Sequence, residues 1–333
     1  MNHNDNAIAA RPGFRRRGLV LGAAASMLPL MSSAQHSAYP SKPVRIVVPF
    51  AAGTSSDSLT RVIAEELSER LKQPFLIENR PGAGGNIGTE FVARSPADGY
   101  TLLMASTPNI AINPTLYTHI AIDPQNTLRA VGLAMSAPNL IVAGNKVPFH
   151  DFAGMVAYAK SHPRKLSYST YANGSTGHLA GAMLNVQAGI DLLHVAAKDP
   201  LSLAVGEHVE LAIVTPTATL PLVRAGSLKA IAVTSIDRIS IAREIPTVSE
   251  SGLKGFDAVA WYGYVAPIRT PDAVVSLIES QLQSILRSSK MKDFAKTTGN
   301  EITWRGASDF SSFMVSERAK WGDAVRQSGA QVS

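Results

Sequence analysis

Cysteine is absent from this chain of 333 residues. Its absence excludes disulfide bonds, thiolate metal ligands and a cysteine nucleophile. It also excludes a leader that ends at a lipid-modified cysteine, so we expect a soluble protein rather than a lipid-anchored one. A chain of this length buries enough surface to be stable without disulfide bonds.

Long apolar runs are scarce, and the clearest one is short. It extends from Gly18 to Met31, follows Arg15–Arg17 and precedes Ser32–Ala34. Crossing a bilayer takes about 20 residues, so this run does not predict a membrane span. A basic segment, an apolar segment and a small-residue segment, in that order, are typical of a signal peptide. We therefore expect a signal peptide over residues 1–34 and export to the periplasm. An amphipathic or buried helix is the alternative. Arg16 and Arg17 fit a twin-arginine signal as well as a Sec signal, and both routes stay open.

Blocks of basic residues are lacking beyond the predicted signal peptide. The whole chain has 31 Lys and Arg against 25 Asp and Glu, a net charge of +6. Residues 1–34 hold four arginines and one aspartate, so removing them leaves 27 basic and 24 acidic residues and a net charge of +3. The basic character is therefore partly a property of the leader. Nucleic acid is not an expected partner.

Patterns that carry catalysis or bind metal ions are also missing. The histidines show neither an H-E-x-x-H motif nor pairs at i, i+4 spacing, and the carboxylates are scattered. We therefore expect no metal, no cofactor and no catalytic residue. The alternative is an enzyme that uses Ser175 and His178 as nucleophile and base. However, Gly174 directly precedes Ser175, so the G-x-S-x-G nucleophile motif is not formed.

Strand-like and helix-like segments alternate along the rest of the chain. Apolar and β-branched runs predict strands at 44–48, 75–77, 100–104, 139–143, 166–169, 192–195, 211–214, 229–234 and 261–266. Apolar residues at helical spacing predict helices at 59–71, 151–161, 177–186, 271–287 and 308–327, the last two with Thr270 and Ser308 as N-caps. This alternation predicts an α/β fold with mainly parallel sheets covered by helices on both faces, and the length predicts two domains.

The most informative segment is the strand–loop–helix junction from Val44 to Asp57. A β-branched run ends at Pro49, a small glycine-containing loop follows, and Ser55 to Asp57 open an amphipathic helix. The first N–H groups of a helix have no partner within the helix and lie at the positive end of its dipole. Such a junction binds a carboxylate or a phosphate. Because it contains no nucleophile–base pair, it predicts capture rather than chemistry.

Two further glycine-containing clusters follow predicted strands. The first, Asn79–Gly88, is off the spacing of a dinucleotide fingerprint, so we interpret it as a loop that lines a cleft or supports the first loop; a plain turn is the alternative. The second, Ser169–His178, again joins a strand end to a helix start. It predicts a second anion-binding helix N-terminus that faces the first across a cleft, and an ordinary capped connection is the alternative.

These segments together resemble one family. The matching strings are Pro49–Asp57, Glu78–Gly88, Asp98–Leu103, Ile112–Tyr117, Ile245–Gly252 and the region from Trp261 to Pro271. They are similar to Bug-type receptors, the extracytoplasmic solute-binding components of tripartite tricarboxylate transporters. The resemblance covers nearly all of the chain after the leader, and Glu78–Gly88 is its most specific part.

The resemblance implies a type II-like, two-domain periplasmic binding protein with a cleft between the domains that closes on its ligand by a hinge motion. It places domain 1 at 39–138 plus 265–333 and domain 2 at 139–264, with crossings near Ala137–Leu140 and Tyr262–Ala266. The implied ligand is a small carboxylate, and the implied partners are the membrane permease subunits of a tripartite transporter. The receptor itself is expected to be a monomer. A ligand sensor that feeds a two-component signalling system is the alternative function.

The ligand-binding residues that follow from the resemblance come from the two loops and three further positions. They are Phe50, Ala51, Ala52, Gly53, Thr54, Ser55, Ser56, Asp57, Asn86, Thr107, Ser169, Asn173, Gly174, Ser175, Thr176, His178 and Thr215. The departures from the family pattern are Ala52, Thr54, Ala196, Ala197, Asp199 and Val214. We expect Thr54 to restrict the first loop, and we expect a less polar second wall that favours a longer or partly apolar acid.

Overall fold

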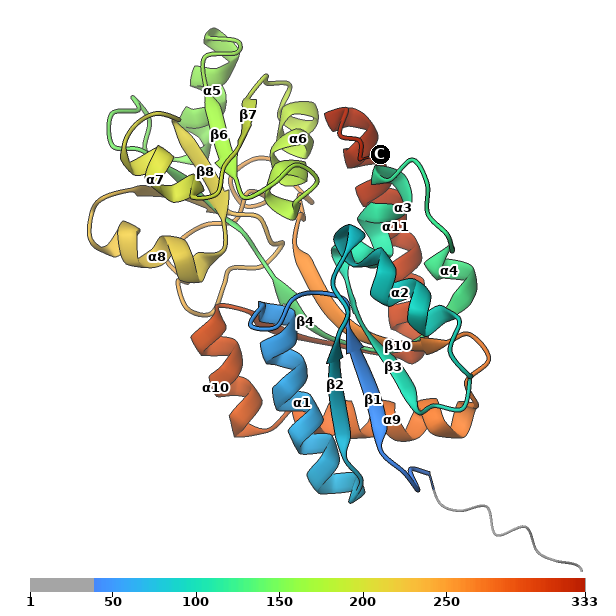
Figure 1. The fold of residues 1–333 in the computed structure, drawn as a ribbon. Coiled ribbons are helices and arrows are strands. Elements are labelled where there is room, and N and C mark those ends of the chain that lie inside the picture. Colours follow the sequence, from blue (N-terminus) through green and yellow to red (C-terminus); the bar gives the residue numbers. More distant parts are fainter. Residues whose placement is uncertain (1–38, 333) are drawn as a thin grey trace, which may run out of the picture. The chain divides into compact units, whose positions relative to one another are not determined.

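The first of two sheets is built around the predicted strand Val44–Val48. The computed structural model describes residues 39–332, so the predicted signal peptide lies outside the described residues. The sheet has the strand order β11-β4-β10-β3-β1-β2. Its strands are β1 Val44–Val48, β2 Phe75–Asn79, β3 Thr101–Ser106, β4 Leu128–Ala137, β10 Ala260–Pro267 and β11 Glu301–Gly306. Around it lie α1 Ser55–Leu71, α2 Asn86–Ala93, α9 Asp272–Leu286, α10 Ser289–Thr298 and α11 Ala307–Ser328 (Figure 1).

The first sheet is buried on both faces, which explains its nearly continuous apolar strands. Val44, Ile46 and Val48 pack with residues of α1, α9 and α10, whereas Val47 points to the opposite face and packs with α2 and α11. This alternation follows from the two-residue repeat of a strand. Covering both faces removes the need for a polar side, as the run of β-branched residues predicts.

The second sheet is shorter and carries the Ser169–His178 cluster. Its order is β7-β6-β8-β5-β9. Its strands are β5 Leu140–Ala143, β6 Ser167–Thr170, β7 Leu193–Ala196, β8 Leu211–Val214 and β9 Lys229–Val233. Its helices are α5 Phe152–Ser161, α6 Thr176–Ala188, α7 Pro200–Val205 and α8 Pro216–Arg224. One face packs on α7 and α8, and the other packs on α5 and α6.

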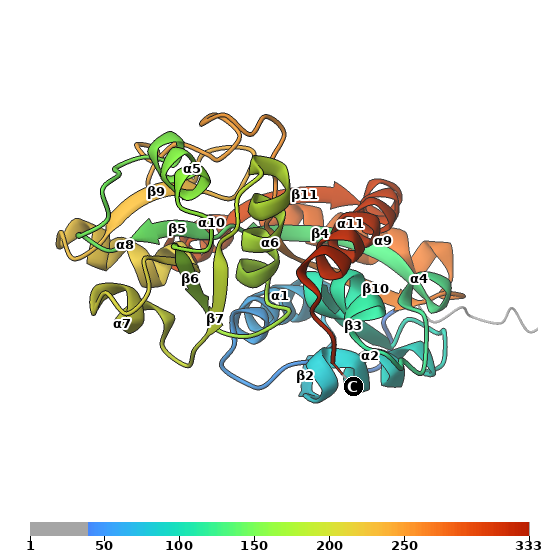
Figure 2. The ribbon, with the colours of Figure 1, turned by 90° about the horizontal axis from the view of Figure 1, so that it is seen from above.

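The chain passes between the sheets twice. It leaves the first sheet at Ala137 and enters the second at Leu140, so that β4 is followed almost directly by β5 (Figure 2). It returns through residues 234–259 to β10. The predicted crossing at Tyr262–Ala266 lies within β10, whose residues pair with β3 and β4.

The α/β class with helices on both sheet faces is confirmed, but the prediction of mainly parallel sheets is wrong. In the first sheet β1 pairs in parallel with β2 and β3, and the other three pairs are antiparallel. In the second sheet β6 pairs in parallel with β7 and β8, whereas β5 runs antiparallel to its two neighbours. The reason is that β4 carries the chain out of the first sheet and its neighbour β10 carries it back, so the two strands run in opposite directions.

The two predicted N-caps are also wrong. Helix α9 is preceded by Pro271 rather than Thr270, and α11 by Gly306 rather than Ser308. The Thr270 hydroxyl is buried without a hydrogen-bond partner in the described part of the chain. Within residues 39–332, no helix combines the length and the apolar character needed to cross a bilayer.

Candidate functional site

The first loop leads into a helix, as the sequence predicts, and Thr54 caps that helix. Thr54 is the N-cap of α1, and its Oγ1 accepts a hydrogen bond from the Asp57 N–H at 3.4 Å. The same hydroxyl donates to the Ala51 carbonyl at 2.9 Å. Thr54 has an extended backbone, with φ −72° and ψ 162°, so the expected restriction by its side chain fits the loop without strain. Gly53 instead takes the left-handed conformation, with φ 83°.

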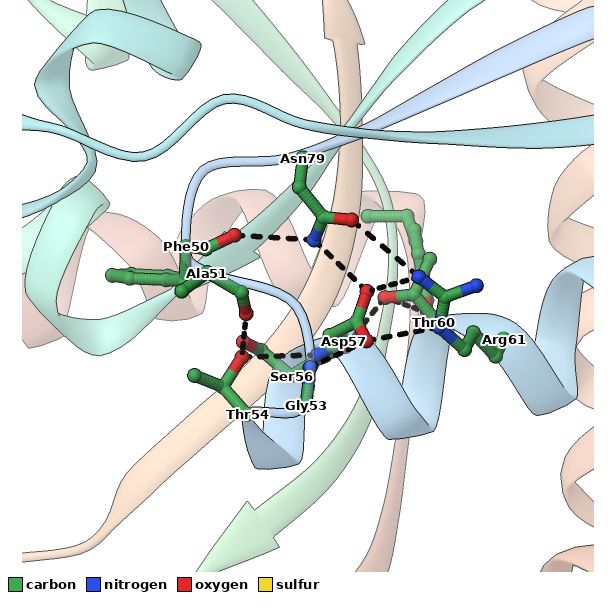
Figure 3. A network of polar contacts seen from close by, with 10 residues as sticks. Phe50, Ala51, Gly53, Thr54, Ser56, Asp57, Thr60, Arg61 and Asn79 are labelled. Carbon is green, nitrogen blue, oxygen red and sulfur yellow. Dashed lines mark hydrogen bonds and ion pairs between the residues drawn. The ribbon is translucent and has the colours of Figure 1, made fainter.

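Asp57 anchors this loop from beneath (Figure 3). One carboxylate oxygen accepts hydrogen bonds from the Gly53 N–H and Arg61 Nε, both at 2.9 Å. The other accepts from Asn79 Nδ2 at 2.9 Å and from Arg61 Nη2 at 3.1 Å. Asn79 Nδ2 also donates to the Phe50 carbonyl at 3.1 Å. Both ends of the loop are therefore tied to one buried carboxylate.

The charge of Asp57 is stabilised by these donors. Burial is the largest single influence and raises the pKa of Asp57. The hydrogen bonds from Arg61, Gly53 and Asn79, together with the Arg61 charge, outweigh burial and hold the pKa of Asp57 below its usual value. Because the Asp57 side chain is buried and engaged by these donors, it shapes the loop, and its contact with a ligand stays a prediction.

The loop keeps backbone donors for an anion. Ala51 to Ser55 are exposed, whereas Ser56 and Asp57 are buried. The N–H groups of Ser55 and Ser56 have no hydrogen-bond partner among residues 39–332. They lie in the first turn of α1, where the helix dipole is positive. Ser56 is buried, so the exposed Ser55 offers the donor that can accommodate a carboxylate without a lysine or arginine.

The second glycine cluster supports the first loop. Gly82, Ala83, Gly84 and Gly85 all have positive φ, and they form a tight turn before α2. A Cβ on Gly85 would lie 3.3 Å from the Phe50 ring, so only glycine allows this close packing. Asn86 Oδ1 accepts from Asn113 Nδ2 at 2.8 Å, which fixes the start of α2. These contacts agree with a supporting role, and the expectation that the cluster lines a cleft stays a prediction.

The Ser169–His178 loop is a second capped helix start. Ser175 is the N-cap of α6, and its Oγ accepts from the His178 N–H at 3.3 Å. Ser175 Oγ donates to Thr170 Oγ1 at 3.3 Å. Asn173 is exposed, and Thr176 is half-buried at the first position of α6. The predicted residues of this loop thus lie together at the end of β6.

The enzyme alternative lacks its essential contact. The His178 ring accepts a hydrogen bond from the Gly174 N–H through Nδ1 at 3.0 Å. Ser175 Oγ bonds to the backbone of His178 and to Thr170, not to the imidazole. A serine nucleophile needs a base that can take its proton. The two side chains are therefore cap and support rather than a catalytic pair.

Three other predicted residues lie in different settings. Thr107 is fully buried, and its hydroxyl accepts from the Trp261 N–H at 2.8 Å. Ser169 is also fully buried and donates to the Pro200 carbonyl at 2.8 Å. Thr215 is the exposed N-cap position of α8. Thr107 and Ser169 thus support strands, whereas Thr215 presents its side chain at the surface.

Sequence reasoning missed three residues that organise these loops. Arg61 lies four residues after Asp57 on α1, a spacing that does predict the ion pair. Asn79 reaches the first loop because β2 pairs with β1 in the register Val48 to Asn79. His194 stacks on His178 only because β7 lies beside β6. The last two contacts depend on strand pairing and leave no local signal.

Other potential sites lie away from the two loops. One cavity of about 740 Å³ is lined by α8, α10 and β11, including Arg224, Lys296 and Glu301, and none of the predicted residues lines it. Within residues 39–332, no three His, Asp or Glu side chains gather as a metal site would require.

Comparisons with known proteins identify the family. Residues 59–330 match the tripartite tricarboxylate transporter family receptor. The periplasmic binding protein BugD has a similar structure, with 32% identity, a TM-score of 0.69, and coverage of 88% of this chain and 99% of BugD. The R. palustris protein Rpa4515, solved with adipate, is 31% identical with a TM-score of 0.74, and coverage is 88% of this chain and 100% of that one. MatC from Rhodopseudomonas palustris, solved with bound malate, is 27% identical with a TM-score of 0.69, and coverage is 86% and 100%.

These similarities confirm the periplasmic binding-protein fold, the expected periplasmic location and the resemblance to Bug-type receptors. They also agree with a binding role in place of catalysis. The chain belongs to the tripartite tricarboxylate transporter receptor family, a family of periplasmic solute-binding proteins.

Proposed function

We propose that this receptor captures a small dicarboxylate and delivers it to the permease subunits of a tripartite transporter. The observation that carries the proposal is the first loop, where the N–H group of the exposed Ser55 at the start of α1 has no partner in the described part of the chain. A second helix start, that of α6, offers the same chemistry to a second carboxylate. Structural relatives that were solved with adipate and with malate support a ligand with two carboxylates.

In this proposal the two loops belong to domains at 39–138 plus 265–333 and at 139–264. Closure brings them onto opposite ends of the ligand through the two crossings, near Ala137–Leu140 and along 234–259. Thr215, at the start of α8, borders the same second-domain wall. The free energy of closure comes from contacts that the ligand makes only when both loops engage it.

A thermal-shift panel tests the ligand class. A ligand that binds only the folded protein raises its melting temperature, by an amount that grows with concentration. We expect malate, adipate or another dicarboxylate to raise it, and monocarboxylates of similar size to have a smaller effect. A rise with neutral sugars and none with any dicarboxylate would overturn the proposal.

Delivery is tested separately in the source cells. Deleting the gene should abolish uptake of the radiolabelled ligand found in the panel, and restoring it should restore uptake. Unchanged uptake together with a lost transcriptional response to that ligand would replace transport with the sensing alternative.

A further inference from the structure

Two stacked histidines lie directly behind the Ser169–His178 loop. The rings of His178, on α6, and His194, on β7, have centroids 3.9 Å apart and an interplanar angle of 26°. His178 is 7% exposed. The Tyr168 ring packs against His194 at a centroid distance of 5.1 Å, and the Tyr168 hydroxyl donates to the His178 carbonyl at 2.9 Å. His178 is therefore buried behind the loop, and the half-buried His194 packs against it.

The pair also closes a ring of polar contacts around the loop. His194 Nε2 lies 2.7 Å from Thr170 Oγ1, which in turn accepts from Ser175 Oγ. Ser175 Oγ caps His178 N, and His178 Nδ1 accepts from the Gly174 N–H at 3.0 Å. Gly174 is held at φ 74°, a conformation that gives the loop its turn. The position of residues 171–175 thus depends on both imidazoles.

This arrangement requires uncharged rings. Because His178 Nδ1 accepts a hydrogen bond, it carries a lone pair, and the proton of the neutral ring is on Nε2. If Nδ1 were protonated, its N–H would face the Gly174 N–H, and neither group could accept a hydrogen bond. In addition, two charged rings stacked at 3.9 Å would repel each other. Burial lowers the pKa of His178, and burial together with the His178 charge lowers the pKa of His194 to about 4.

Few charged groups face the pair. The titratable residues on its own elements are His178 on α6, Tyr168 on β6 and His194 on β7, and β8 has none. Lys198 and Asp199 follow β7, and α11, which packs along α6, carries several charged side chains. None of these charges contributes to the pKa shift of either ring. No described carboxylate is therefore in place to favour a charged imidazole.

We infer that His178 and His194 are positioning residues of the ligand site: as a stacked neutral pair they hold residues 171–175 so that the start of α6 is presented to the ligand. The inference rests on the proposed function and adds a dependence on pH. Protonation of the rings disrupts the contacts that hold the loop, so ligand affinity falls once pH drops below the lowered pKa values that the rings have in the ligand-free protein.

The decisive variant is His178→Asn. Asparagine places a carbonyl oxygen near the position of Nδ1, so it can still accept from the Gly174 N–H but cannot be protonated there. The dissociation constants of wild type and variant for malate or adipate are measured by calorimetry from pH 8 to pH 4.5. The ratio of the two constants at each pH cancels the titration of the ligand itself.

The ratio of the two dissociation constants at pH 7.5 is the reference for the lower pH values. Once pH falls below the lowered pKa that the His178 ring has in the ligand-free protein, wild type should lose affinity relative to His178→Asn by up to about tenfold per pH unit, since a group that must stay neutral weakens binding in that proportion below its free pKa. His178→Leu, which removes the acceptor, should bind weakly at every pH. Full affinity of His178→Leu, or a constant ratio between wild type and His178→Asn, would overturn the inference.

A ligand-independent measurement separates this inference from the proposed function. Nitrogen-15 NMR of the imidazoles in the full, ligand-free protein should show His178 as the neutral Nε2–H tautomer at pH 7 and both rings titrating below pH 6.5. An ordinary titration near 6.5 would contradict the pairing even where binding succeeds. His194→Gln, which keeps a hydrogen-bonding atom near Thr170, serves as a second variant if His178→Asn fails to fold.

Discussion

At the scale of single residues, Asp57 shows how a buried carboxylate can hold an exposed loop in shape. Its carboxylate accepts from Gly53, Asn79 and Arg61 and leaves no face towards the open side of the loop. A charge beneath the loop fixes the backbone, and the backbone then presents N–H groups above it. In the proposed function, one layer of peptide therefore separates the charge of the ligand from that of Asp57.

Asp57→Asn should lower the free energy of unfolding by about 1–3 kcal/mol at pH 7, because a charge-assisted set of hydrogen bonds is replaced by neutral ones. The pKa of Asp57 is lowered in the folded state, so its contribution is present above the ordinary aspartate pKa of about 3.9 and is lost as pH falls through the folded value. Urea unfolding of both proteins between pH 7 and pH 3 measures this difference.

The matched control for Asp57 is Asp323→Asn. Asp323 pairs with Arg326 on the surface of α11, and both side chains are mostly exposed. Exposed ion pairs contribute about 0–1 kcal/mol, so this variant should stay close to wild type. Equal effects at both positions would remove the anchoring role from Asp57.

At the scale of elements, α6 is a helix with almost no outer face. Every residue from Gly177 to Leu184 is buried. Small side chains let it approach the second sheet closely, since a Cβ on Gly177 would lie 2.5 Å from the Ile213 carbonyl oxygen. A helix held on all sides points its N-terminus in a fixed direction, which suits a binding site better than a mobile loop would.

Gly181→Ala should destabilise the protein by about 1–3 kcal/mol, because the added methyl group would lie 2.2 Å from the Tyr168 ring. That ring is buried and bonded to the His178 carbonyl, so it has little freedom to move. Thermal unfolding measures the loss. Gln187→Ala, on the exposed part of the same helix, should change stability by less than about 0.5 kcal/mol. A larger loss in this control would mean that any change in α6 destabilises the protein, so that the loss in Gly181→Ala would not be specific to the Tyr168 contact.

Helix α11 is tied to β10 by a buried carboxylate. Glu317 accepts from Trp261 Nε1 at 2.9 Å and from Trp321 Nε1 at 2.7 Å. Glu317→Leu leaves both indole N–H groups buried without an acceptor, which should cost about 2–5 kcal/mol. Tryptophan fluorescence, measured during unfolding, reports directly on Trp261 and Trp321, the two donors to Glu317. Wild-type stability in this variant would show that water or another group replaces the carboxylate.

At the scale of the whole molecule, the sequence predicts the local pieces well and their pairing poorly. The strand Val44–Val48 and the strand–loop–helix junctions that lead into α1 and α6 have local signatures, and they form as expected. The antiparallel pairing of β4 with β10 joins residues more than 120 positions apart, and no local pattern encodes it. Strands β4 and β11 were not predicted at all, because small and polar residues interrupt their apolar runs.

The same limit applies to the site. Backbone donors at a helix start are visible in a sequence, since caps and glycine mark them. What holds those donors in place is not visible, because Asn79 and His194 reach the loops from neighbouring strands. Resemblance to a family supplies the list of residues, but only the three-dimensional contacts separate anchors such as Asp57 from donors such as Ser55.

The central claim is that backbone N–H groups of the first loop bind the ligand carboxylate, and Ser55→Pro tests it most directly. Ser55 is the first residue of α1, where proline is well tolerated, and Thr54 before it already has the extended backbone that proline requires. The change therefore removes one N–H donor and leaves the helix intact. Ser55→Ala, which keeps the N–H group, is the control.

Calorimetric titration with the dicarboxylate identified in the thermal-shift panel gives the deciding numbers. We predict that Ser55→Pro keeps the melting temperature of the ligand-free protein but binds about 10- to 100-fold more weakly, whereas Ser55→Ala binds nearly as wild type, because a hydrogen bond to a charged group contributes about 1.5–3 kcal/mol. Wild-type affinity in Ser55→Pro would contradict the account.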